Sequence, residues 1–108
     1  MGYCDGRVVI VTGAARGLGR AYALAFAREG ATVVVNDLGV SREGFGFDSS
    51  PALDLVAEIE AAGGTAVSNV ADVSDWDQAE AMVVETVDLF GRLDTLVCNA
   101  GFYAIECL

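Results

Sequence analysis

The chain has 108 residues, with 16 acidic side chains against 6 basic ones and a formal net charge of −10. A chain of this length forms one domain or part of one. Its excess of acidic residues excludes the basic surface that nucleic acids require, and an anionic membrane would repel the protein. Three cysteines without a CxxC spacing, and no histidine, argue against a disulfide framework or a zinc site. Because the sequence also lacks a signal-peptide pattern and any run of 18 apolar residues, we expect a reduced cytoplasmic protein without a membrane span.

Strand-forming and helix-forming stretches alternate along the chain. The β-branched run at 8–11 predicts a strand, and a helix over 17–29 follows, ended by Gly30. A second strand at 32–36 leads through a loop to a helix over 51–62, with Ser50 as N-cap and Pro51 in the first turn. A third strand is predicted at 66–70 and a fourth at 95–98.

Between the third and fourth strands lies the third helix. Ser74 is predicted as its N-cap, Asp77 as the reciprocal capping carboxylate, and Gly91 as its end. One apolar stripe, formed by Trp76, Val83, Val87 and Phe90, is expected to pack against the sheet.

The alternation predicts the fold class: an α/β, Rossmann-type parallel sheet of about four strands in the order 3-2-1-4, with helices on both faces. The 54% hydrophobic content agrees with strands covered on both sides. Residues 1–108 would then form a single, partial dinucleotide-binding domain. Its fourth strand would be an apolar sheet edge, so we expect an oligomeric or aggregation-prone protein.

The first strand runs into a glycine-spaced turn, TGAARGLG, that opens the first helix. Gly13, Gly17 and Gly19 leave room beside the backbone N–H groups, and the positive end of the helix favours an anion such as a dinucleotide pyrophosphate. The Thr12 hydroxyl can hold the turn in place. The spacing is looser than GxGxxG, and an ordinary tight turn is the alternative.

Asp37 follows the second strand, 18 residues beyond Gly19. A carboxylate at this place can accept hydrogen bonds from a ribose diol and repels a 2′-phosphate, which favours NAD over NADP. Arg16 and Arg42 favour the opposite preference, because a guanidinium can pair with a phosphate. A simple turn residue is the other reading of Asp37.

Two further segments follow strands: Asp72 and Val73 after the third, and Cys98, Asn99, Ala100 and Gly101 after the fourth. Since ligands of open parallel sheets bind outside the carboxyl ends of the strands, both segments are expected at the same edge as the glycine turn.

Together these residues resemble the short-chain dehydrogenase/reductase family. TGAARGLG looks like its TGxxxGxG motif, Asp72 like its adenine-binding aspartate, and residues 98–101 like its NNAG motif, with Cys98 replacing the first asparagine. The stretch GLGRAYALAFAREGATVVVNDLG is similar to the hydroxyacyl-CoA dehydrogenase domain of multifunctional β-oxidation enzymes and to bacterial relatives.

The resemblance implies an NAD-dependent oxidoreductase, with NADP less favoured. It assigns the pyrophosphate to the backbone of the turn, the ribose to Asp37, the adenine to Asp72 and Val73, a sheet-bracing role to Asn99, and the nicotinamide side to Ala100 and Gly101. The pyrophosphate-binding residues would be Gly13, Arg16, Gly17, Leu18 and Gly19.

The family's catalysis uses a tyrosine, a lysine four residues later that lowers the tyrosine pKa, and a serine. This chain contains no lysine, so no catalytic residue is predicted in it. The sequence leaves three readings open: the cofactor-binding half of an oxidoreductase, a non-catalytic nucleotide-binding module, or an inactive fragment. Whether a truncation, a frameshift or a partial segment ends the motif so early also stays open.

Overall fold

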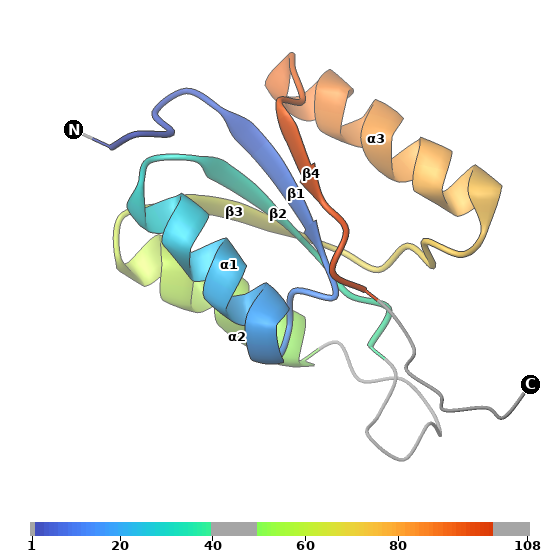
Figure 1. Ribbon diagram of the computed structural model, residues 1–108, viewed down its shortest axis with the longest axis horizontal. Helices are drawn as coiled ribbons and strands as arrows, with labels where there is room; N and C mark the ends of the chain where they lie inside the picture. Colours follow the sequence, from blue (N-terminus) through green and yellow to red (C-terminus); the bar gives the residue numbers. More distant parts are fainter. Residues whose placement is uncertain (1, 40–49, 101–108) are drawn as a thin grey trace, which may run out of the picture.

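The computed structural model describes residues 2–39 and 50–100. Strands and helices alternate through the whole of this part (Figure 1), as the sequence predicts. The elements are β1 (Val8–Thr12), α1 (Gly17–Arg28), β2 (Thr32–Asn36), α2 (Ser50–Ala61), β3 (Thr65–Asn69), α3 (Trp76–Phe90) and β4 (Thr95–Val97).

The four strands form one parallel sheet in the order β3-β2-β1-β4, so the predicted fold class and strand order are confirmed. In register, Val9 of β1 pairs with Val33 of β2 and with Thr95 of β4. The unbroken β-branched runs of β1 and β2 are buried almost throughout, because helices cover both faces of these central strands.

Helices α1 and α2 lie on one face of the sheet and α3 on the other (Figure 1). The larger core lies under α1 and α2, where Val11 and Val35 of the sheet cluster with Leu55 and Ile59 of α2. The smaller core lies under α3 and joins Ile10, Val34 and Met82.

Several predicted bounds are wrong by a residue. Helix α2 includes Ser50, which the sequence placed as its N-cap, and it ends at Ala61. Its last turn tightens as the Ala62 N–H is shared between the carbonyls of Glu58 and Ile59, and that takes Ala62 out of the regular helix. Strand β3 runs one residue earlier than predicted, and β4 one residue shorter.

The face that α3 turns towards the sheet also differs from the prediction. Met82 and Thr86 are the buried residues of α3, whereas Trp76 is 80% exposed and Val87 is 41% exposed. Val83 and Phe90 do pack against the core, so the helix is rotated by roughly 50° from the predicted orientation at 3.6 residues per turn. Thr86 tolerates burial because its hydroxyl donates to the Met82 carbonyl at 2.8 Å. The apolar surface of α3 is therefore broader than the part that the sheet covers.

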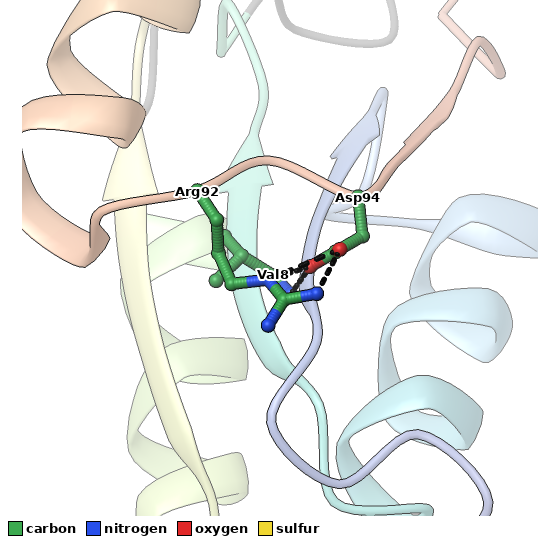
Figure 2. Close-up of polar contacts among 3 residues, drawn as sticks. All are labelled: Val8, Arg92 and Asp94. Atoms are coloured by element: carbon green, nitrogen blue, oxygen red, sulfur yellow. Dashed lines mark hydrogen bonds and ion pairs between the residues drawn. The ribbon is translucent and has the colours of Figure 1, made fainter.

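A polar clamp fastens β4 to β1 at the amino edge of the sheet (Figure 2). The Val8 N–H donates to the Asp94 carboxylate at 2.8 Å, and the Asp94 N–H donates to the Val8 carbonyl at 2.9 Å. The Arg92 guanidinium donates to both oxygens of the same carboxylate. Hydrogen bonds from Arg92, and then from Val8, lower the pKa of Asp94, and Asp94 raises the pKa of Arg92.

Candidate functional site: the carboxyl edge of the sheet

All four strands end at one edge of the sheet, because the sheet is parallel (Figure 1). The segments predicted to bind a ligand follow directly: the glycine turn after β1, Asp37 after β2, Asp72 after β3 and Asn99 after β4. The topology therefore brings sequence-distant candidates to one side of the molecule.

Glycine is required at different positions of the turn for different structural reasons. Gly13 and Gly17 have φ values of +62° and +61°, in the left-handed region that residues with a Cβ rarely adopt. A Cβ on Gly17 would meet none of the described atoms within 4 Å, so the space beside it is open to a ligand. A Cβ on Gly19 would lie 2.2 Å from the Gly13 carbonyl oxygen, so this glycine permits α1 to pack on the turn.

The N-terminus of α1 has no side-chain cap within residues 2–39 and 50–100. Its N-cap residue is Arg16, and its first turn contains no acidic residue. The first regular helical bond is the Arg20 N–H donating to the Arg16 carbonyl, so Gly17, Leu18 and Gly19 present N–H groups without helical acceptors. This donor set, at the positive end of a helix dipole, suits an anion.

Asp37 lies beside the turn and is half-buried. Its Oδ2 accepts the Ala15 N–H at 3.0 Å, and its Oδ1 accepts the Gly39 N–H at 2.9 Å. The preceding residue of β2, Asn36, accepts the Ala14 N–H through its carbonyl at 3.0 Å. The end of β2 thus holds two successive amides of the turn.

Asn99 and Thr12 hold the turn from the other side. The Thr12 hydroxyl accepts the N–H groups of Asn99 and Ala100, each at 2.9 Å, and donates to the Val97 carbonyl at 3.2 Å. The Asn99 side-chain amide donates to the Gly13 carbonyl at 3.2 Å. These contacts give the Thr12 hydroxyl the anchoring part that the sequence suggested for it.

Asp72 lies in the tight turn between β3 and α3. Its Oδ1 accepts the Ser74 N–H at 2.9 Å and the Ser74 hydroxyl at 2.5 Å, and these hydrogen bonds lower the pKa of Asp72. The neighbouring Val73 is exposed. In the described part of the chain, no hydrogen bond joins Asp72 or Val73 directly to the glycine turn.

The predicted cap of α3 is wrong. Its N-cap is Asp75, whose Oδ1 accepts the N–H groups of Asp77 and Gln78 at 3.0 and 3.3 Å. Ser74 lies one residue before this cap, and its hydroxyl and N–H both donate to Asp72. Gln78 therefore stands at the reciprocal position, where its side-chain amide donates to the Asp75 carboxylate, while the Asp75 N–H donates to the Asp72 carbonyl.

One pair of polar residues, Asn36 and Asn69, was not predicted from the sequence. The side chain of Asn36, only 2% exposed, donates to Asn69 Oδ1 at 2.9 Å and to the Ala71 carbonyl at 3.1 Å. Asn69 Oδ1 also accepts the Ala71 N–H at 2.9 Å. The available signal was an asparagine at the end of each of two neighbouring strands, and the two asparagines pair in register. The pair fixes the end of β3, and with it the approach to Asp72.

The structure therefore links the glycine turn, Asp37, Asn99 and Ala100 by direct hydrogen bonds, and it relates Asp72 and Val73 to them through the Asn36–Asn69 pair. Gly101 and Arg42 lie outside the described residues. Cys98 is exposed, beside Asn99.

A groove of about 510 Å³ lies away from these residues, between the C-terminal ends of α1 and α2. Its lining includes Gly30, which precedes β2, and Gly64 and Thr65 at the start of β3, all at the amino edge of the sheet. It is therefore separate from the carboxyl-edge site.

Comparison with known proteins places this geometry in a family. The chain matches the short chain dehydrogenase family over residues 7–107 and belongs to it. Members of this family of oxidoreductases use a nicotinamide dinucleotide, and the uncapped helix, the open space at Gly17 and the Asp37 carboxylate fit such a group.

Particular relatives are similar over most of this chain. It is 56% identical to the peroxisomal multifunctional enzyme type 2 of Mus musculus, over 90% of this chain and 13% of the relative. It is 50% identical to a putative short-chain type dehydrogenase/reductase of Mycobacterium tuberculosis, over 88% of this chain and 33% of the relative. A short chain dehydrogenase from Mycobacterium avium has a crystal structure that matches with a TM-score of 0.86 and 56% identity, over 96% of this chain and 36% of that one.

The chain thus spans about a third or less of the length of these relatives. Across the described residues, no helix is both long enough and apolar enough to cross a membrane.

Proposed function

We propose that residues 1–108 form the cofactor-binding part of a short-chain oxidoreductase, which transfers a hydride between a nicotinamide cofactor and an alcohol or ketone. The observation that carries the proposal is the uncapped N-terminus of α1 beside the carboxylate of Asp37. The cofactor, when bound, supplies the hydride chemistry. The residues of this chain bind and orient it.

Each candidate residue has a proposed part in holding the cofactor. The backbone of Gly13, Arg16, Gly17, Leu18 and Gly19 would bind the pyrophosphate, Asp37 the adenosine ribose, and Asp72 with Val73 the adenine. Asn99 would brace the turn, and Ala100 with Gly101 would line the nicotinamide side.

NAD is the proposed cofactor in preference to NADP. The Asp37 carboxylate lies next to the turn and would repel a 2′-phosphate, which supports this preference. Arg16 is exposed at the N-cap of α1, and its guanidinium supports the opposite preference. Side-by-side titration of the protein with NAD and NADP decides between them.

A 3-hydroxyacyl-CoA is the substrate class that we propose for the intact enzyme, on the similarity to peroxisomal multifunctional enzymes. We also propose that the protein is cytoplasmic, although several relatives carry peroxisomal names. Finally, we propose association through β4, whose Leu96 is 46% exposed at the sheet edge. A sharp monomer peak in light scattering would contradict such association.

A non-catalytic nucleotide-binding module, or an inactive fragment, is the second candidate for the chain acting alone. Its support is the complete absence of lysine and histidine from the 108 residues, which leaves neither the family's lysine nor an imidazole base. On this reading the chain binds NAD without turning over a substrate.

Ligand-dependent melting separates these proposals. NAD at about 100 times its Kd adds about 2.7 kcal/mol of stability, which raises the Tm by on the order of 10 °C for a domain of this size. An unchanged Tm would contradict cofactor binding. Turnover of a 3-hydroxyacyl-CoA by the 108-residue chain would contradict the argument from the missing lysine.

A further inference from the structure

Asp37 makes two contacts that a ribose-binding role does not require. The Ala15 N–H and the Gly39 N–H donate to opposite oxygens of its carboxylate, at 3.0 and 2.9 Å. Ala15 is 7% exposed and belongs to the larger core, so this amide is shielded from water. A buried N–H that loses its acceptor is costly, and a charged acceptor makes the stronger bond.

The contact with Ala15 fixes one side of the glycine turn. Ala14 and Ala15, the two residues after Gly13, donate to Asn36 and Asp37 at the end of β2. On the other side, Asn99 holds the Gly13 carbonyl. The turn is therefore held between β2 and β4, and the Asp37 carboxylate is the charged member of this arrangement.

We propose that Asp37 is a positioning residue for the glycine turn, independent of any contact with ribose. This inference rests on the proposed dinucleotide site. Through Ala15, the carboxylate holds the backbone that leads into the N-terminus of α1, where the pyrophosphate would bind. Substitutions at Asp37 then weaken NAD binding through the turn as well as through the ribose, and the displaced turn opposes the gain in NADP affinity that loss of the 2′-phosphate repulsion would give.

The acceptor capacity of a carboxylate allows both functions. An ionised carboxylate offers about four lone-pair sites, and the N–H groups of Ala15 and Gly39 use two of them in the described part of the chain. A ribose diol could use the other two. An asparagine would direct an NH2 group towards one of the backbone amides, so Asp37→Asn keeps the shape but loses half of the acceptors.

The experiment compares Asp37→Asn and Asp37→Ala with Glu60→Gln, which removes the same charge from the exposed face of α2. The first readout is amide hydrogen exchange at Ala15 in the ligand-free protein, with β3 amides as the internal reference. We expect exchange at Ala15 to accelerate at least about tenfold in both Asp37 variants, as loss of a charge-assisted bond predicts. Exchange in β3 and in Glu60→Gln should not change.

The second readout is the Kd of NAD and of an NAD analogue that lacks the 2′- and 3′-hydroxyls of the adenosine ribose. If Asp37 positions the turn, both substitutions weaken binding of the analogue about tenfold. Equal affinity of the analogue for the wild type and the variants, with unchanged exchange at Ala15, would overturn the proposal.

Failure of the proposed function is distinguishable from failure of this inference. If the wild type binds neither NAD nor the analogue, the dinucleotide site is wrong, and the exchange at Ala15 alone decides the positioning role. Acceleration that extends equally to β3 would mean a general loss of stability, and it too would overturn the proposal. Asp37→Asn, which is nearly isosteric, carries the test if Asp37→Ala does not fold.

Discussion

Helices α1 and α3 begin at the same edge of the sheet but satisfy their N-terminal amides in opposite ways. Helix α3 has an acidic N-cap, Asp75, that accepts two backbone N–H groups, and a further acid, Asp77, in its first turn. Helix α1 has a basic N-cap, Arg16, whose side chain accepts no backbone N–H in the described residues, and its first turn has no acid. The chain can therefore cap a helix where it is needed, and it leaves α1 available to a ligand.

The difference has an energetic cost. A missing side-chain cap costs about 1 kcal/mol of stability, and a cation at the positive end of the dipole adds a small penalty. At α1 these costs coincide with the glycine turn and with the open space at Gly17. The missing cap therefore lowers the stability of the fold but leaves backbone N–H groups that a pyrophosphate can bind.

Filling the space beneath the α1 turn should have the largest effect. In Gly19→Ala, the Cβ would lie 2.2 Å from the Gly13 carbonyl oxygen and 2.5 Å from the Asn99 side-chain nitrogen, so the turn must move. We expect at least about 100-fold weaker NAD binding by calorimetry, equivalent to about 2.7 kcal/mol. Gly64→Ala is the control, because its Cβ would also clash, at 2.8 Å from Ile59 Cγ2, but in the loop that follows α2 and away from the candidate site. Equal NAD affinity in the two variants would contradict the prediction.

Giving α1 an acidic N-cap like that of α3 should raise the stability of the protein and weaken its NAD binding. Arg16→Asp supplies an acceptor for the free amides, so we expect about 1 kcal/mol more stability in denaturant unfolding. The same carboxylate competes with and repels the pyrophosphate, so NAD affinity should fall about tenfold. Arg16→Gln removes the charge without adding an anion, and its NAD affinity should lie between those of the wild type and Arg16→Asp. A rise in affinity for Arg16→Asp would show that the amides of α1 are not the anion site.

Removing the cap of α3 should affect stability and little else. Asp75→Ala leaves the Asp77 and Gln78 N–H groups without their acceptor and should cost about 1 kcal/mol in urea unfolding. The NAD affinity should change less than twofold, since nothing assigns this helix start to the pyrophosphate. Asp88→Asn, on the exposed surface of the same helix, controls for the lost charge.

The smallest effect concerns the two carboxyl groups whose pKa the folded structure lowers. The pKa of Asp94 is lowered by Arg92 and Val8, and the pKa of Asp72 by Ser74. A carboxyl with a lower pKa in the folded state adds stability above its unfolded pKa of about 3.9. This contribution is lost as the pH falls through the folded pKa. In Asp94→Asn the acid-limb fall in Tm should therefore be shallower than in the wild type, and in Asp88→Asn it should not. Identical slopes for Asp94→Asn and the wild type would contradict the role of the clamp.

The order of the elements could be predicted because β-branched runs, glycine stops and helical spacing are local signals. The orientation of α3 could not, because its apolar residues cover more of the helix than the sheet does, and spacing alone does not say which part faces inwards. Its cap was predicted at Ser74 because Ser74 and Asp75 are both good caps. The helix begins at Trp76, so Asp75 is its cap, and Ser74 instead donates to Asp72.

In the candidate site, too, local sequence signals predict some features and tertiary packing decides the others. The strand ends located Asp37 and Asn99 at one edge, since a parallel sheet requires it. The contacts of Asp37 with Ala15 and of Asn99 with Gly13 depend on tertiary geometry that no local pattern encodes. The Arg92–Asp94 clamp lies at the other edge and belongs to no motif, so no local pattern predicts it.

The clamp and the Thr12 contacts also have a consequence for how the site assembles in time. Val8 and Asp94 are 86 residues apart, and Thr12 and Ala100 are 88 apart, whereas Ala15 and Asp37 are 22 apart. Closing a long loop costs more chain entropy than closing a short one, and distant pairings slow folding. On the ribosome, the β2 side of the turn can form as soon as its short loop is made. The β4 side must wait until almost all of the 108 residues have emerged. The glycine turn is thus begun once Asp37 has emerged and is braced only once Ala100 has.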